Sequence, residues 1–243
     1  HVLRETWVPP VRSFLNSQWR PKESVGEVVD FFQLWEQVLP KKMIREIYDE
    51  IILRRLRKEV QHWDPRKDTV MVHTWLHPWL PHLGGDSMSD LWQSIKFKLG
   101  SCLQEWHPSD SSALILLSPW KGVFDEHTWE SLMIRSILPK LLFSIRSMEL
   151  NPKQQNIEPF RWLMTWSELL PIKHVISVLE NEFFPRWLEI LQIWLKRNPN
   201  YDEIVQWYVG WKGEFPAPLL KEDKIKEALA LGLKLMNQAL SKQ

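Results

Sequence analysis

Three histidines lie within ten residues of one another and could, by residue type, bind a metal ion. His73 and His77 are four positions apart, a spacing that places two imidazoles on one face of a helix, and His82 follows closely. A zinc-protease helix would carry a glutamate directly after His73, and Pro78 is expected to end a helix beside His77. We therefore expect these histidines to cap or pack, and the sequence predicts no metal site.

The sequence contains none of the residue patterns that typically supply a catalytic nucleophile. It has no Gly-x-Ser-x-Gly turn and no Cys-His signature. The single cysteine, Cys102, lies in an apolar stretch and is expected to be a small core residue. Gly84 and Gly85 are not followed by the Lys-Ser/Thr pair of a phosphate-binding loop. The sequence thus predicts no enzyme activity, no cofactor and no small-molecule substrate.

A basic residue recurs in similar local sequence, at intervals of 43, 42 and 46 positions (98−55, 140−98 and 186−140). Each lies three positions after a large apolar residue and directly before another. The four residues are Arg55, Lys98, Lys140 and Arg186. In one interpretation they are solvated charges whose aliphatic stems cover an apolar seam. In the other they line one side of the molecule and bind an acidic protein surface or an RNA backbone, with little effect on stability. These four are the candidate partner-binding residues.

A tryptophan recurs with a period of about 44 residues, and a proline keeps the same period. The tryptophans are Trp35, Trp79, Trp120, Trp166 and Trp211, and the prolines are Pro21, Pro65, Pro108, Pro152 and Pro199. Between these markers, apolar residues recur at the helical spacing i, i+3, i+4, i+7. Each unit is expected to be a shorter helix ending near the tryptophan, a proline-containing turn and a helix of about 20 residues.

This pattern predicts an all-α fold, a solenoid of about five HEAT-like helix pairs forming a single domain over residues 1–243. The marker tryptophans should be buried at equivalent positions. Pro139 and Pro185 lie inside the longer helices and are expected to kink or break them. A helix is expected to start at Asn151-Pro152, where an N-cap residue precedes proline. Because the sequence opens on histidine, we expect it to be part of a longer protein.

The composition limits the partners that the chain can be expected to bind. Its 31 basic residues are balanced by 30 acidic ones, whereas a protein that neutralises many phosphates is usually more basic. No apolar stretch is long enough to span a membrane, and a single cysteine favours a reducing compartment. Bulk charge therefore does not support nucleic-acid binding, although it leaves room for a local basic patch.

Several sequence blocks resemble one known family. They are residues 75–81 (Trp-Leu-His-Pro-Trp-Leu-Pro), 106–112 (Trp-His-Pro-Ser-Asp-Ser-Ser), 183–188 (Phe-Phe-Pro-Arg-Trp-Leu) and 207–212 (Trp-Tyr-Val-Gly-Trp-Lys). The chain resembles the C-terminal region of G-patch splicing factors that belong to the domain family named after the GC-rich sequence DNA-binding factor. The resemblance spans nearly the whole chain.

The resemblance implies a nuclear protein of pre-mRNA splicing. Similar factors bring a DEAH-box RNA helicase to the late, intron-lariat spliceosome for disassembly and bind that helicase through a G-patch, which these 243 residues do not contain. The expected function is therefore a docking scaffold for spliceosomal proteins, with RNA as a further candidate partner. The alternative is direct binding of RNA or DNA in a basic groove, but the sequence shows no helix-turn-helix and no zinc finger.

Overall fold

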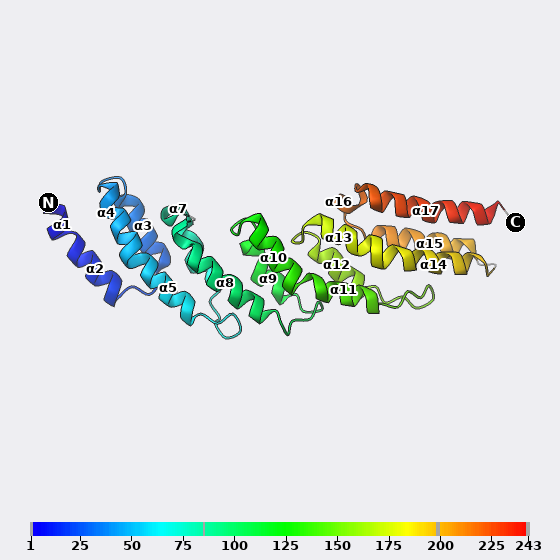
Figure 1. Ribbon diagram of the computed structural model, residues 1–243, viewed down its shortest axis with the longest axis horizontal. Coiled ribbons are helices and arrows are strands. Elements are labelled where there is room, and N and C mark those ends of the chain that lie inside the picture. The colour runs from blue at the N-terminus through cyan, green and yellow to red at the C-terminus, as the bar shows by residue number, and fades with distance from the viewer. Residues whose placement is uncertain (1, 85, 198–199, 242–243) are drawn as a thin grey trace. The chain divides into compact units, whose positions relative to one another are not determined.

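The structure is a computed structural model that describes residues 2–84, 86–197 and 200–241 (Figure 1). All of its regular elements within these ranges are helices, and no strand occurs in them. The prediction of an all-α chain is therefore confirmed. The contacts group the chain into two compact units, residues 1–104 and 105–243, each of which is described by itself. A single domain over residues 1–243 stays a prediction.

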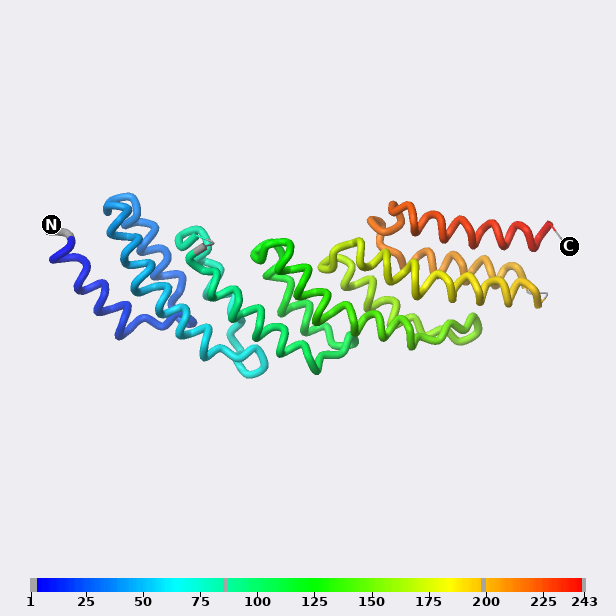
Figure 2. The backbone as a smooth tube through the Cα atoms, viewed as in Figure 1, coloured from blue at the N-terminus to red at the C-terminus, as the bar shows by residue number. Residues whose placement is uncertain are grey.

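Unit 1 is built from α-helices joined by short turns and by brief 3-10 or π segments. The α-helices are α1 (Val2–Thr6), α2 (Val8–Ser17), α3 (Val25–Trp35), α4 (Lys41–Ile47), α5 (Leu53–His62), α6 (Val72–Leu76), α7 (Leu80–Leu83) and α8 (Ser89–Cys102). The other segments are η1 (Tyr48–Ile52), η2 (His77–Trp79) and η3 (Asp86–Met88). The path from α4 through η1 to α5 is one continuous helical rod (Figure 2).

In unit 2, as in unit 1, a single helix is followed by a longer helical stretch of one or more segments. We call the first the short helix and the second the long helix of a pair. Its α-helices are α9 (Ser112–Leu117), α10 (Glu126–Ser136), α11 (Leu138–Ser147), α12 (Glu158–Trp166), α13 (Ile172–Val178), α14 (Phe184–Leu195), α15 (Tyr201–Gly213), α16 (Ala217–Leu220) and α17 (Asp223–Leu240). The other segments are η4 (Ser118–Trp120) and η5 (Leu179–Phe183). The longest α-helix among these, α17, lies alongside α14 (Figure 1).

Helix α5 shows how the sequence specifies these elements. Leu53, Leu56 and Val60 recur at helical spacing and are buried, whereas Arg54 and Lys58 lie on the opposite face and are exposed. The apolar face drives the packing of the helix, and the charged face keeps its outer side in water.

Four of the five marker tryptophans are buried, as predicted. Trp79, Trp120, Trp166 and Trp211 are at most 4% exposed. Trp35 differs, because it is only half-buried, and its ring contacts Trp7 at a centroid distance of 5.0 Å. Equivalence in sequence therefore does not give equal burial at this position.

Short helices touch two neighbours through aromatic rings. In unit 1, Phe32 of α3 lies 5.1 Å from Tyr48 on the long helix that follows and 6.4 Å from Trp79 at the end of the next short helix, measured between ring centroids. In unit 2, Phe160 of α12 lies 4.7 Å from Phe183 on its long helix and 5.2 Å from Trp211 on the next short helix. Both short helices thus pack against their own long helix and the next short one.

The predicted kinks or breaks differ between Pro139, where the helix is interrupted, and Pro185, where the chain stays helical. Helix α10 ends at Ser136 and α11 restarts at Leu138, with Pro139 in its first turn. Pro185 lies in the first turn of α14, directly after the π-helical segment η5. A proline lacks a backbone N–H and displaces the preceding turn, so both positions suit a helix start better than a helix interior.

Two local predictions are wrong. Asn151-Pro152 does not start a helix, because α12 begins at Glu158 and the Asn151 side chain instead accepts a hydrogen bond from the Lys153 N–H at 3.1 Å. The proline-containing turn expected after Trp79 is also absent, because Pro81 lies within α7, and the chain turns at Gly84, where φ is +72°. Glycine adopts this left-handed conformation without a steric penalty.

Candidate functional site

The side chains of the four recurring basic residues all donate hydrogen bonds to backbone carbonyls of an earlier segment. Arg55 donates to the carbonyls of Asn16, at 3.2 Å, and of Trp19. Lys98 donates to the carbonyls of Gln61, at 2.7 Å, and of Trp63. Each side chain therefore reaches from a long helix to the C-terminal end of the long helix before it in unit 1.

The same arrangement occurs in unit 2. Lys140 donates to the Trp106 carbonyl. Arg186 donates to the carbonyls of Ile145, at 2.9 Å, and of Met148. Lys140 thus reaches the turn that precedes α9, and Arg186 reaches the end of α11.

These contacts have a simple electrostatic basis. The last carbonyls of an α-helix have no partner within the helix, and the helix dipole places partial negative charge on them. A cation donating to these oxygens is therefore stabilising. The accepting residues are also fixed by burial, because the side chains of Trp19, Trp63, Trp106 and Met148 are at most 8% exposed. Arg55, Lys98 and Arg186 thus each fasten one helical segment to the end of another, whereas Lys140 fastens α11 to the turn before α9.

The four charges remain partly accessible, because each of these residues is half-buried. Partial burial lowers the pKa of Lys98, and the nearby carboxylates of Asp64 and Asp68 oppose that effect. Lys98 makes two carbonyl contacts with an ammonium group that carries three N–H donors. In the structure, Arg55 and Lys98 thus bind backbone carbonyls within unit 1, and Lys140 and Arg186 bind backbone carbonyls within unit 2.

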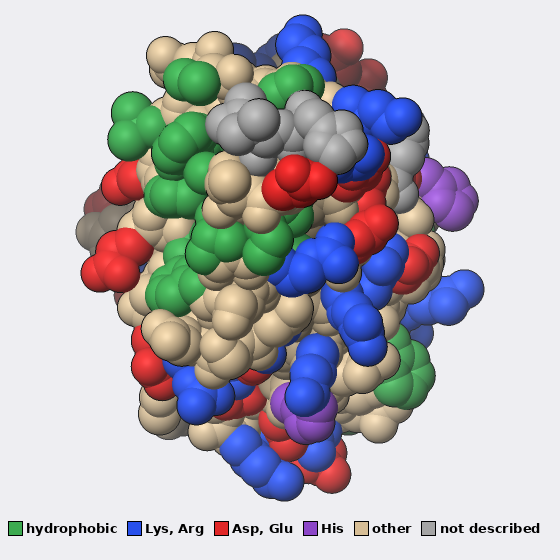
Figure 3. Space-filling view, turned by 90° about the vertical axis from the view of Figure 1, so that its left-hand side faces the viewer, with side chains coloured by type: hydrophobic (Ala, Val, Ile, Leu, Met, Phe, Trp, Pro, Cys, Tyr) green, Lys and Arg blue, Asp and Glu red, His purple; other side chains and the backbone are tan. Residues whose placement is uncertain are grey.

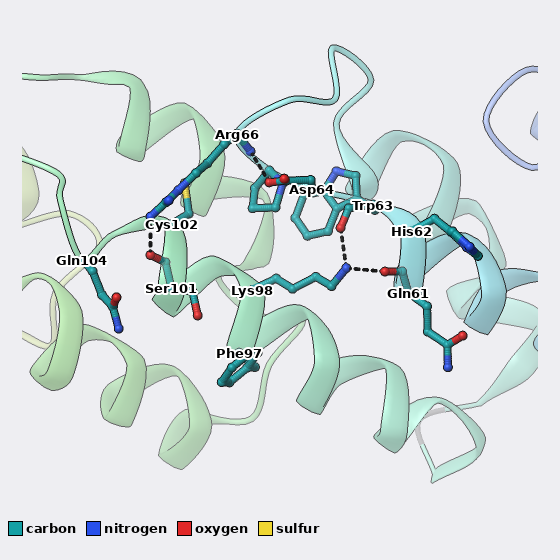
Figure 4. A pocket seen from close by; sticks show the side chains of 11 residues that line it. Gln61, His62, Trp63, Asp64, Arg66, Phe97, Lys98, Ser101, Cys102 and Gln104 are labelled. Atoms are coloured by element: carbon teal, nitrogen blue, oxygen red, sulfur yellow. Dashed lines mark hydrogen bonds between the residues drawn. The ribbon is translucent and has the colours of Figure 1, made fainter.

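A pocket of about 470 Å³ lies beside Lys98, between the end of α5 and helix α8 (Figure 4). Arg66 crosses it and donates to the Ser101 carbonyl at 2.9 Å. Phe97 lines the same pocket, and 75% of its surface is exposed. Cys102 also lines it and is half-buried, so the expectation of a core cysteine is wrong.

Unit 2 has a pocket of about 410 Å³ at the corresponding end of α11. Phe143 lines it and is 70% exposed. His107 and Trp162 also line this pocket, and their rings meet edge to face at 5.3 Å. Phe143 follows Lys140 by three positions, just as Ser101 follows Lys98, so the two pockets occupy equivalent places along their helices.

His73 and His77 lie next to each other, and His82 has other partners. The rings of His73 and His77 are 5.6 Å apart between centroids, and burial lowers the pKa of both. His82 is turned elsewhere, with its Nδ1 2.9 Å from the Glu36 carboxylate, which also accepts a hydrogen bond from the Tyr48 hydroxyl at 2.5 Å. Within the described residues, no group of three or more His, Cys, Asp or Glu side chains could hold a metal ion.

The sequence matches a known protein family over most of its length. Residues 1–191 match the family described as GC-rich sequence DNA-binding factor-like protein. The chain belongs to this family. Among the helices described, none is both long and apolar enough to cross a membrane.

The curated relatives include proteins named tuftelin-interacting protein 11. Those of Xenopus tropicalis and Danio rerio are each 43% identical to this chain over 240 residues, and that of Gallus gallus is 40% identical. Each match covers 99% of this chain but only 28 to 29% of the relative. The chain therefore spans less than a third of the length of these relatives.

Sequence reasoning missed the two exposed phenylalanines. Phe97 lies inside one of the recurring frames, Ile-Lys-Phe-Lys-Leu, where the equivalent residue of the first frame is Arg54. A large apolar residue at a position that is charged elsewhere in the pattern is a usable signal. Phe143 carries the same signal, because it lies three positions after Lys140, whereas the charged Lys58 lies three positions after Arg55.

Proposed function

We propose that this chain is a non-catalytic docking scaffold of a pre-mRNA splicing factor in the nucleus. The factor acts in disassembly of the late, intron-lariat spliceosome, and a G-patch outside these residues binds a DEAH-box RNA helicase. Family membership and the similarity to tuftelin-interacting protein 11 over 99% of the chain support this assignment. The chain's own part is to hold spliceosomal proteins, while the rest of the polypeptide recruits the helicase.

We further propose that the helix pairs form a HEAT-like solenoid of about five units. Two recurring contacts support it: the basic residue that fastens one long helix to the end of the preceding segment, and the short helix that packs on its own long helix and the next short one. Stacked helix pairs of this kind provide extended surfaces for binding other macromolecules.

One observation carries the docking function, namely the exposure of Phe97 and Phe143. A phenylalanine that is 70% or more exposed is unfavourable in water, and here each one borders a pocket whose other lining groups are largely polar. Buried aromatic anchors surrounded by polar groups dominate the binding energy of protein interfaces. We propose that both rings enter partner pockets.

The recurring cations have a supporting role in this proposal. Lys98 follows Phe97 directly, and Lys140 precedes Phe143 by three positions. We propose that these two residues, with Arg55 and Arg186, favour acidic partner surfaces and speed association, because rim charges act mainly on association rates. Their contact with a partner stays a prediction.

The test replaces both phenylalanines by alanine in the full-length protein. Binding to purified intron-lariat spliceosomes, measured by co-sedimentation, should weaken about tenfold or more, because losing anchor residues costs more than about 1.4 kcal/mol. The matched control is Leu34→Ala with Ile115→Ala, because these side chains are 69% and 63% exposed but line neither pocket. Equal binding by both double variants would rule out the phenylalanine anchors.

Nucleic-acid binding is the alternative function, and the pocket beside Lys98 favours it. Lys98, Arg66 and the exposed Phe97 ring could together contact phosphates and stack on a base. Net charge gives little support, because unit 1 has 15 basic against 13 acidic residues, and unit 2 has 16 against 17. Affinity for single-stranded RNA that falls steeply with salt would favour this alternative, whereas protein docking depends less on salt.

A further inference from the structure

An apolar groove of about 340 Å³ lies between α2 and α3 in unit 1. Val11, Phe14 and Leu15 line it from α2, and Val28 and Phe31 line it from α3. Phe14 is 43% exposed, and Val11 and Phe31 are half-buried. Apolar side chains also gather on one side of the face that the α1 and α2 end presents (Figure 3). This groove is separate from the pocket that Phe97 lines.

The burial of equivalent residues shows that the groove lacks a covering element. Phe31 and Trp75 each lie four positions before a marker tryptophan, yet Trp75 is fully buried and Phe31 is not. The two markers differ in the same way, since Trp79 is fully buried and Trp35 is half-buried. Both differences fall on α3, so they report one missing neighbour of that helix.

The packing of the other short helices indicates what the neighbour is. A short helix lies against its own long helix and the next short helix, as Phe32 does with Tyr48 and Trp79. Phe160 of α12 repeats this arrangement in unit 2. The groove is bordered by α3 and by α2, which follows α1 after a single residue, Trp7. A short helix preceding α1 would therefore fit there.

We propose that a short amphipathic helix from the same polypeptide, encoded just before residue 1, lies in the groove between α2 and α3. Its apolar face would present an aromatic residue, as Phe32 and Phe160 do in their helices. The exposed carboxylate of Glu27 at the rim of the groove favours a lysine or arginine at the edge of that face. The relatives have room for such a segment, because the matched region is only 28 to 29% of their length.

The proposal assigns the occupant to the same chain because of connectivity. In unit 1 the short helix α3 reaches its long helix through a turn of five residues, 36–40. Helix α1 leads into α2 after one residue, so a helix that precedes α1 by a similarly short turn is held beside the groove at high effective concentration, which a separate partner lacks. This inference depends on the packing of α2 and α3 and is independent of the proposed docking function.

A photocrosslinking experiment on the full-length protein tests the proposal. The photoreactive residue p-benzoylphenylalanine replaces Phe14, and in a control protein it replaces Leu34, which is 69% exposed on α3 but does not line the groove. After illumination, mass spectrometry identifies the crosslinked peptides. The expected result is a crosslink from position 14 to a peptide of the same chain that lies just before residue 1, several-fold above the position 34 control.

Other crosslinking results would overturn the proposal. A product of doubled mass would assign the groove to a second copy of the chain. A crosslink to a different protein, or a yield at position 14 no higher than at position 34, would exclude a covering helix from the same chain. None of these outcomes depends on spliceosome binding, so failure here is distinguishable from failure of the docking function.

A stability comparison provides an independent readout in the same full-length protein. Phe14→Asp should lower the melting temperature more than Phe14→Asn does, because both variants lose the ring but only the aspartate would bury a charge without a partner in a covered groove. If the groove is open, the aspartate lies in water, and the two variants should melt alike. Equal melting temperatures would also overturn the proposal.

Discussion

Replacing Lys98 by methionine tests whether the recurring cations stabilise the fold. Methionine has similar length but no N–H donors, so the carbonyls of Gln61 and Trp63 at the end of α5 lose the donors that Lys98 supplies. Hydrogen bonds from charged groups and the helix-dipole interaction each contribute on the order of 1 kcal/mol at partly exposed sites. We expect Lys98→Met to lower the free energy of unfolding by about 1 to 2 kcal/mol.

The assay is urea unfolding followed by circular dichroism and tryptophan fluorescence. Lys96→Met is the matched control, because Lys96 lies two positions earlier on α8 and so on a different side of the helix. Lys98→Arg should recover most of the loss, since arginine also donates to carbonyls. If Lys98→Met is as stable as Lys96→Met, the carbonyl contacts do not contribute and the capping argument fails.

This geometry also changes how the docking role of the four cations should be tested. The sequence alone predicts that replacing Arg55, Lys98, Lys140 and Arg186 by glutamate leaves the melting temperature nearly unchanged. In the structure each glutamate would face the carbonyl oxygens that now accept hydrogen bonds from the cation. Like partial charges repel, so the quadruple variant should be destabilised. Binding must therefore be compared at a temperature where every variant is folded.

Three further predictions concern packing and pH. Gly232→Ala should lower the free energy of unfolding of unit 2 by about 1 to 2 kcal/mol in urea, because the added methyl would lie 2.8 Å from the Trp187 ring. An increase in that free energy would contradict this prediction. Trp166→Ala should cost about 3 to 5 kcal/mol and Trp35→Ala clearly less, because only Trp166 is fully buried; equal losses would refute this ranking. Hydrogen bonds from Arg161 lower the pKa of Glu214. The contribution of Glu214 to stability is therefore present above the ordinary glutamate pKa and is lost as the pH falls. Glu214→Gln should therefore weaken the acid dependence of unfolding, and an unchanged dependence would exclude this contribution.

The sequence by itself determined the helical class and the position of most of the core. Apolar residues at helical spacing specify which face of a helix avoids water, as Leu53, Leu56 and Val60 do in α5. Prolines specify where a helix can start, which is why the interruption beside Pro139 was predictable. These properties depend on neighbours within a few positions of the chain, so the local sequence is sufficient.

The same local reasoning failed at Asn151-Pro152 for an identifiable reason. An asparagine followed by proline suits both a helix start and a turn, and the two differ only in what the next residues contact. Here the Asn151 side chain accepts a hydrogen bond from the Lys153 N–H. The Gln155 side chain folds back to the start of the turn, where it accepts from the Asn151 N–H and donates to the Glu149 carbonyl. These contacts close a turn before α12 begins.

Only the tertiary structure decided what the recurring residues touch. The period placed Lys98 on one side of its helix, but its partners, the carbonyls of Gln61 and Trp63, lie 35 to 37 positions away. Likewise, Trp35 and Trp79 share a sequence pattern, yet their burial differs. The short helix before Trp79 places Phe32 against the Trp79 ring, whereas no equivalent ring of a preceding short helix is described beside Trp35. Burial and capping depend on which segment lies opposite, and the spacing of residues along one helix does not contain that information.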